Sequence, residues 1–337
     1  MSDLDLSAAP ATASGARRLA VQALLWQAAV PIALVLLLLG FAAVEPTVLT
    51  PGNLVNIVQQ ASYLALFAMA QTVVILTRGF DLALGPTVSM VSVGAALAMA
   101  GTVASGYDPV AVLLIGLAAG FALGAACGLF NGLVVACLRV SPFVATLGSY
   151  NIAIGIATTL SAGRPVQGVP DLFSHLLYGA SVFGVPAAVL ITLIVGATLH
   201  LVLTRTVYGR ELYIIGTNPR AATVAGLPVK RLLVATYVLC STLAALGALM
   251  MTARTGSGEP NLGGSLSLQA IAAAVVGGTS LAGGRGGVGT AVVGALFVTI
   301  LSNGMNLTRI DGYVQMVVLG AIVIIGVVLD RLRLERR

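Results

Sequence analysis

The sequence predicts an all-α polytopic membrane protein with about ten transmembrane helices. Its 337 residues are 58% hydrophobic and only 8% charged, whereas an average soluble domain has about 25% charged residues. Apolar stretches close to the roughly 20 residues that cross a bilayer recur along the chain. The positive charges fall mostly into alternate connections between these stretches, which is the arrangement expected of membrane helices.

Nine apolar stretches have about the length of a membrane span, and a tenth is shorter. The nine lie near residues 21–44, 54–76, 82–104, 110–138, 142–161, 185–203, 232–253, 287–305 and 313–329. The short stretch, near residues 268–282, is rich in glycine. We count it as the eighth of ten spans because of the charge distribution described next.

With a cytoplasmic N-terminus and ten crossings, 14 of the 17 Lys and Arg residues fall on the cytoplasmic side, as the positive-inside rule requires. Without the short span, the cluster between Arg331 and Arg337 would lie outside. We therefore expect cytoplasmic tails at residues 1–20 and 331–337 around a single transmembrane domain at residues 21–330. Topology and lipid headgroups explain the net charge of +6, so no nucleic-acid partner is expected.

The first apolar stretch follows Arg17 and Arg18, as in a signal peptide, but it exceeds the usual apolar core of about 7 to 15 residues. We therefore interpret it as a membrane helix. The three cysteines lie in or beside apolar stretches and are interpreted as packing residues. Neither they nor His175 and His200 have the spacing of a metal site.

A polar face is predicted in the second apolar stretch. Its residues are Asn56, Gln60, Tyr63, Phe67 and Gln71, whose spacings of three and four place them on one side of a helix. Uncharged amides and aromatic rings suit a neutral, hydroxyl-rich solute, so we assign them to a translocation path. Hydrogen bonds that only hold helices together are the alternative. Asn151 and Asn303 are further candidates across the bundle.

The third and fourth stretches contain an acidic residue and a row of glycines. Asp81 is predicted to accept backbone N–H groups where the third helix begins; proton transport is the alternative, but no second deep ionisable residue accompanies it. The fourth stretch has glycine at every fourth position, at Gly116, Gly120, Gly124, Gly128 and Gly132. This pattern predicts close contact with a neighbouring helix.

Two short matches suggest an inverted repeat. Asn131-Gly132 and Leu147-Gly148 flank a predicted cytoplasmic turn, and Asn303-Gly304 and Leu319-Gly320 flank a predicted outer turn at the same spacing. Inverted repeats allow a transporter to open one site to either side in turn. Chance is the alternative for so few residues.

The chain lacks the sequence features of an ATP-binding protein. The stretch Gly284–Gly289 matches a dinucleotide-binding pattern, but a membrane span follows it where that site needs a soluble fold. A P-loop needs lysine followed by Ser or Thr, and the single lysine, Lys230, is followed by Arg231. No catalytic residues are therefore predicted.

Five blocks of the sequence resemble the permease subunits of bacterial ABC importers for ribose, xylose, galactose and related sugars. They are RGFDLALG at 78–85, NGLVVACLRVSPFVATLGS at 131–149, GRPV at 163–166, YGRELYIIGTNPRAATVAGLPVKR at 208–231 and GSGEPNLGGSLSLQAIAAAVVGGTSLAGGRGGVGT at 256–290. The resemblance implies the inverted-repeat ABC importer permease fold in the bacterial inner membrane. It also implies a second permease copy, identical or paralogous, two separate ATPase domains, and a periplasmic binding protein that delivers the sugar.

The cytoplasmic loop at residues 204–231 contains the part that resembles an ATPase-docking coupling helix. Its candidate residues are Gly216, Asn218, Pro219, Ala221, Ala222, Gly226 and Leu227. Asn218 and Pro219 are suited to begin a helix and Gly226 to end it, and the alanines are expected to let a partner approach closely. The outer loops around Arg164 and Arg254 are expected to receive the binding protein.

Two departures from the family leave the cargo open. The block beginning at Arg78 differs from the usual family sequence, and Gln269 stands where the family often has an acidic residue. Branched-chain amino acids or nucleosides are alternative cargoes for the same architecture. An ion-coupled secondary transporter is a rival, but the spans lack the buried carboxylates that it would need. A non-transporting scaffold would explain the glycine row but not the polar face.

Overall fold

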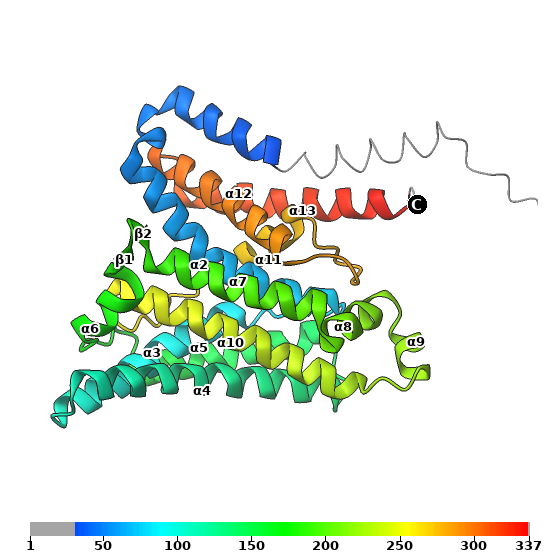
Figure 1. Cartoon of the computed structure of the whole chain (residues 1–337), viewed down its shortest axis with the longest axis horizontal. Helices are drawn as coiled ribbons and strands as arrows, with labels where there is room; N and C mark the ends of the chain where they lie inside the picture. The colour runs from blue at the N-terminus through cyan, green and yellow to red at the C-terminus, as the bar shows by residue number, and fades with distance from the viewer. Residues whose placement is uncertain (1–30, 336–337) are drawn as a thin grey trace, which may run out of the picture.

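The computed structural model describes residues 31–335, so the predicted tail at residues 1–20 and the start of the first span lie outside the described residues. Long helices run side by side as a bundle (Figure 1). One end of the bundle has a small hairpin of β1 (Ser181–Val182) and β2 (Val185–Pro186), and the other has the short helix α9 (Pro219–Val224). We call these the hairpin end and the α9 end.

Within residues 31–335, ten apolar helices correspond to the ten predicted stretches. Seven are long and apolar enough to cross a membrane: α2 (Pro51–Leu76), α3 (Leu84–Ala104), α4 (Pro109–Ala136), α5 (Pro142–Ser161), α7 (Ala187–Arg205), α10 (Val229–Thr255) and α12 (Val288–Leu307). Three have shorter apolar segments: Pro31–Val44, α11 (Leu266–Gly277) and Gly312–Val328, which lies within α13 (Gly312–Glu335). The described chain therefore confirms the predicted all-α polytopic fold.

The remaining elements are short and lie at the two ends of the bundle. η1 (Pro46–Leu49), α6 (Asp171–Ser174) and the π-helical turn η2 (His175–Gly179) are at the hairpin end, and α8 (Val207–Thr217) precedes α9 at the other. α13 continues to Glu335, through much of the segment predicted as a C-terminal tail.

The predicted eighth span proves to be a shorter helix, because α11 ends at Gly277. Its 12 residues extend for only about 18 Å, whereas the hydrocarbon core of a bilayer is about 30 Å thick. Gly278 has a φ of +111°, which ends the helix in a conformation that suits glycine. The irregular segments 256–265 and 278–287 lie on either side of α11.

The glycine row in α4 packs against α10, as predicted. Gly124 lies against Ala245 and Ser241, and a Cβ added to Gly128 would lie 2.5 Å from the carbonyl oxygen of Tyr237. Gly120 and Gly132 face the same helix, whereas Gly116 faces Met99 in α3. The absence of side chains lets the two backbones approach closely, which supplies packing contacts where lipid provides no hydrophobic drive.

α3 and α11 begin inside the bundle, and their first turns meet. The Ser267 hydroxyl accepts the N–H of Gly85 and donates to the carbonyl of Leu82, both at 2.8 Å. A Cβ at Gly263 would overlap the carbonyl of Gly85, so the two backbones are in direct contact. One serine hydroxyl therefore joins the starts of the two helices.

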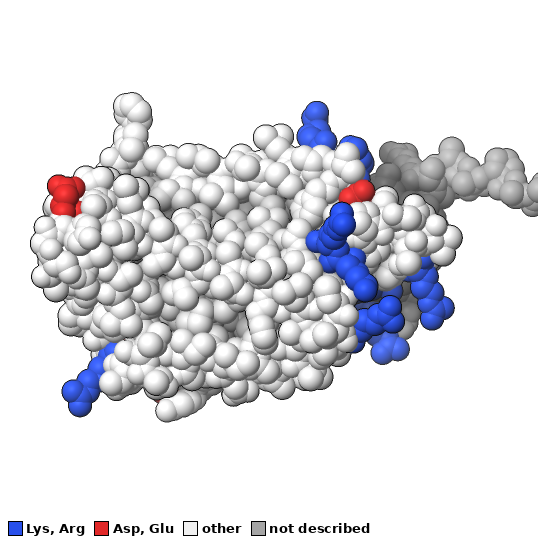
Figure 2. Space-filling model, turned by 90° about the horizontal axis from the view of Figure 1, so that it is seen from below, with Lys and Arg blue, Asp and Glu red and all other residues white. Residues whose placement is uncertain are grey.

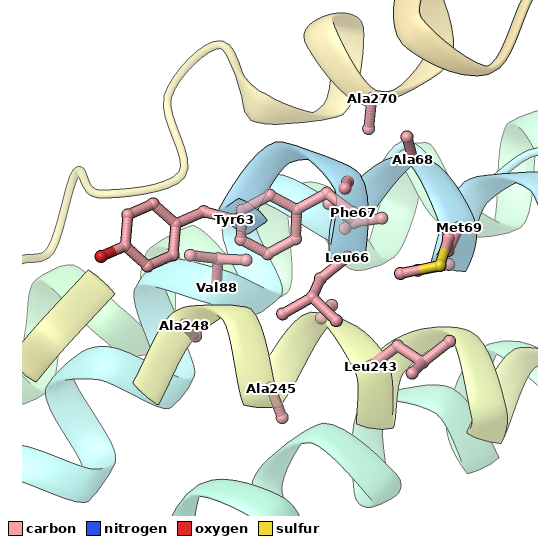
Figure 3. Close-up of a cluster of buried hydrophobic side chains, with 14 of the residues drawn as sticks. Tyr63, Leu66, Phe67, Ala68, Met69, Val88, Leu243, Ala245, Ala248 and Ala270 are labelled. Carbon is pink, nitrogen blue, oxygen red and sulfur yellow. The ribbon is translucent and has the colours of Figure 1, made fainter. Parts of the chain in front are cut away.

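α2 lies at the centre of the molecule and is buried from Ala61 to Leu76. Its Tyr63, Leu66 and Phe67 side chains pack among residues of α3 and α10 (Figure 3). The basic side chains gather at the α9 end (Figure 2), where α7 ends and α10 begins. This segregation agrees with the predicted charge distribution.

Candidate functional site

A cavity of about 130 Å³ lies between four helices in the half of the bundle nearer the hairpin end. α2 contributes Gln60, Tyr63, Leu64 and Phe67, α10 contributes Met251 and Arg254, α11 contributes Leu266 and Gln269, and α12 contributes Thr299 and Ser302. Amides, hydroxyls and aromatic rings thus line one space with a single charged side chain. Such a wall can hold a small polar molecule by hydrogen bonds and ring contacts.

The structure brings three of the residues predicted for the path into this cavity: Gln60, Tyr63 and Phe67. Asn56 is next to them, because the Gln60 amide donates to its side-chain oxygen at 2.8 Å. The helical spacing therefore predicted that the first four residues of this face, from Asn56 to Phe67, lie together.

The other three predicted path residues lie elsewhere. Asn303 and Asn53 exchange two hydrogen bonds, at 2.9 and 3.0 Å, which join α12 to α2. Gln71 is fully buried, and its amide pairs with the backbone N–H and carbonyl of Asp81 at 3.2 Å in the orientation that matches donors to acceptors. Asn151 is exposed on α5 and donates to the carbonyl of Leu147 in its own helix.

The two arginines predicted to dock the binding protein differ in position. Arg164 is exposed in the connection after α5. Arg254 is also exposed, but it is next to the last residue of α10 and lines the cavity. Sequence reasoning placed Arg254 in an outer loop and missed its place in the cavity wall. It also missed Thr299 and Ser302 of the same wall. Their spacing of three is a weak signal, because hydroxyl residues are common within apolar helices.

The coupling segment forms a helix between the predicted capping residues. The Asn218 side chain accepts the N–H of Ala221 at 3.0 Å, and Pro219 is the first residue of α9. Gly226 follows the helix with a φ of +79°. These three residues therefore have the local conformations predicted for them.

α9 has one inward face and one outward face. Ala222 is fully buried and packs with Ile215 and Leu232. Val224 is 90% exposed, and Ala221, three residues before it, is exposed as well. Ala222 thus contacts the permease chain itself, and Val224, which sequence reasoning missed, is the apolar side chain offered to the surroundings.

The remaining coupling candidates surround α9. Gly216 is buried in α8, where a Cβ would overlap the carbonyl of Leu76 at the end of α2. Leu227 is half-buried and packs against the cluster of Ala222. Both residues therefore fix the segment to the bundle.

Arg78 joins the coupling segment to the turn between α2 and α3. Its Nε donates to the carbonyl of Gly216 and one terminal nitrogen donates to the carbonyl of Thr217, both at 2.6 Å. These carbonyls are at the end of α8, where no further helical N–H groups follow to bind them. The contact spans about 140 positions of sequence, so no local pattern predicted it.

Replacing Arg78 with methionine should loosen the coupling segment, because two charge-assisted hydrogen bonds are lost. We expect a loss of about 1 to 3 kcal/mol in local stability and faster trypsin cleavage between residues 205 and 231 in membrane vesicles. Arg139→Met is the control, because Arg139 is also exposed, also has a positive φ, and lies outside the digested segment. Unchanged cleavage in the Arg78 variant would show that these bonds do not hold the segment.

A second hollow lies beside α9, at the same end of the bundle. This groove of about 730 Å³ is bounded by the α4–α5 connection and the start of α10, and it has three basic residues, Arg139, Lys230 and Arg231. Val140, Leu227 and Val229 supply part of its apolar wall. The exposed face of α9 and this groove together form a surface of mixed apolar and basic character.

Asp81 is buried in the turn before α3, as an acceptor of backbone hydrogen bonds. One carboxylate oxygen accepts the N–H of Ala83 at 2.9 Å, and the Cys240 thiol lies 3.8 Å from the other oxygen. The helix begins at Leu84 with Ala83 as its N-cap residue. Asp81 therefore accepts a backbone N–H group where the third helix begins, as predicted, although the N-cap residue itself is Ala83.

Comparisons with known proteins agree with these features. The family described as "Branched-chain amino acid transport system / permease component" matches residues 53–327. The ribose import permease protein RbsC of Escherichia coli (strain K12) is 38% identical over 324 residues, which cover 95% of this chain and 98% of that protein. RbsC of Bacillus subtilis (strain 168) is 34% identical over 299 residues, covering 88% and 90% of the two chains.

A third relative is named for a different sugar. The D-allose transport system permease protein AlsC of Escherichia coli (strain K12) is 36% identical over 289 residues, which cover 84% of this chain and 85% of that protein. No solved structure matches the chain significantly.

Proposed function

Because the chain belongs to the permease family of the branched-chain amino acid transport system type, we propose that it is the permease subunit of an ATP-driven sugar importer. Its similarity to ribose import permeases over nearly their full length carries this proposal. The chain would form the translocation path for a monosaccharide. Ribose and D-allose, for which these relatives are named, are both neutral sugars with several hydroxyl groups, of the kind that the cavity wall suits.

The energy would come from a separate ATPase that binds at the α9 end. This sequence has a single lysine and no P-loop. Val224 on α9 and the adjacent groove with Arg139, Lys230 and Arg231 offer a partner both apolar and basic contacts. The positive-inside rule supports a cytoplasmic location for this end and for both termini.

The hairpin end would then face the periplasm and receive a solute-binding protein. Arg164 and Arg254 are exposed there, and the cavity lies in this half of the bundle. A second permease copy, identical or paralogous, would complete the complex in the bacterial inner membrane. Two ATPase domains would match the two copies.

The proposal is tested by reconstitution of this chain in lipid vesicles with an ATPase subunit and a sugar-binding protein from the same genome. We expect uptake of radiolabelled D-ribose or D-allose only when all components and ATP are present. A catalytically inactive ATPase is the control. Uphill accumulation by this chain alone under an ion gradient would instead establish a secondary transporter, and ATP-driven uptake of leucine or uridine without sugar uptake would assign another cargo.

A further inference from the structure

From the cavity between α2, α10, α11 and α12, we infer that the permease itself has a cargo subsite, in which Tyr63 and Arg254 select the cargo by its oxygen atoms. This inference rests on the proposed function. It goes further by assigning part of the cargo selectivity to named permease residues, in addition to any selection by a binding protein.

The Tyr63 hydroxyl is the first observation. Tyr63 is 3% exposed, and its oxygen has no hydrogen-bond partner among the described residues. A buried hydroxyl without a partner is costly, and this one belongs to a side chain that lines the cavity. A hydroxyl group of a bound sugar can both donate to it and accept from it.

The size and lining of the cavity limit what it can hold. The observed 130 Å³ is close to the volume of about 150 Å³ that holds one benzene ring, so the cavity has room for one small ring and not for two. The rings of Tyr63 and Phe67 lie next to each other on α2 (Figure 3) and supply an apolar surface. Gln269, Thr299 and Ser302 supply polar groups on the facing helices. The subsite therefore fits one monosaccharide ring better than a disaccharide.

Arg254 is the only charged residue of the cavity lining in the described structure. Its guanidinium has donors and no acceptor, so it can bind hydroxyl or ring oxygens but repels a cationic cargo. It is exposed near the end of α10, so it is placed to meet the cargo on entry. Tyr63, in contrast, meets the cargo deeper in the cavity.

The experiment measures how well the importer distinguishes D-ribose from its 2-deoxy and 3-deoxy analogues. Turnover is measured in vesicles with the complete complex at saturating concentrations of sugar-loaded binding protein, so that differences in binding-protein affinity do not contribute. Tyr63→Phe removes one hydroxyl and keeps the ring. A site that bonds a hydroxyl strongly rejects a ligand that lacks it, so we expect this variant to reduce the preference for ribose over one analogue by about 10-fold.

Arg254→Gln distinguishes cargo binding from docking of the binding protein. A cargo contact predicts turnover at saturation that falls by an amount that differs between sugars. A docking contact alone predicts that more binding protein is needed, with the same turnover for every sugar. Matched controls at the hairpin end are Tyr107→Phe and Arg309→Gln, both at exposed positions outside the cavity, which should keep the unsubstituted preference.

The outcomes separate the inference from the proposed function. Uptake with unchanged sugar preferences in the Tyr63 and Arg254 variants would overturn the subsite and leave the importer assignment in place. A complete, unsubstituted complex that imports no sugar would overturn the proposed function and the subsite with it. A changed preference in the two variants but not in the controls supports both.

Discussion

Replacing Val224 with aspartate should reduce binding of the ATPase to the permease by at least about 10-fold. Val224 is 90% exposed at the end of α9, so the substitution leaves the packing of the bundle unchanged. In a complex this side chain would lose contact with water, and a carboxylate there would pay a large desolvation cost. Co-purification of the ATPase with the permease measures the effect, and transport should fall with it.

Two variants control this result. Val182→Asp makes the same change in the hairpin, at the opposite end of the bundle, and should leave ATPase binding unchanged. Ala222→Leu enlarges the buried face of α9, so it should lower the stability of the permease itself by about 1 to 3 kcal/mol. Normal ATPase binding by the Val224 variant would remove the outward face of α9 from the docking surface.

Replacing Gly128 with leucine should prevent α4 and α10 from packing together. An added Cβ would lie 2.5 Å from the Tyr237 carbonyl oxygen and 2.6 Å from the Val238 Cα, and these backbone atoms cannot turn away as a side chain can. We expect a loss of about 3 kcal/mol or more, seen as a much lower yield of folded protein in detergent and a lower midpoint of thermal unfolding.

Gly155→Leu is the matched control for this prediction. Gly155 lies within α5, and a Cβ there has no neighbouring atom within 4 Å among the described residues. The variant should fold as well as the unsubstituted protein, because leucine also favours the helix more than glycine does. Similar behaviour of the two variants would mean that the glycine contact between α4 and α10 does not hold the bundle together.

Features that depend on local spacing could be predicted from the sequence. A glycine at every fourth position makes one smooth helix face whatever the partner is, so the contact of Gly124 and Gly128 was predictable without knowledge of α10. Asn218 and Pro219 act within a few residues of themselves, so they could be assigned in the same way.

Features that depend on distant contacts or on backbone angles could not be predicted. Hydropathy does not report the positive φ of Gly278, so the eighth predicted stretch continues past the end of α11 at Gly277. The six residues of α9 are too few for a helical period to separate Ala222 from Val224. Asn303 has the polar side chain expected of a path residue, but only the fold shows that its amide is hydrogen-bonded to the side chain of Asn53.

Arg78 connects the α9 end of the molecule to the helix that lines the cavity, and this connection has a thermodynamic consequence. Its guanidinium binds the carbonyls that precede α9, and its backbone continues directly from α2, whose Tyr63 and Phe67 line the cavity. If engagement of α9 by a partner changes the cavity through this connection, linkage requires that cargo in the cavity changes the affinity for that partner by the same factor. A sugar and an ATPase that never touch would then report on each other's occupancy.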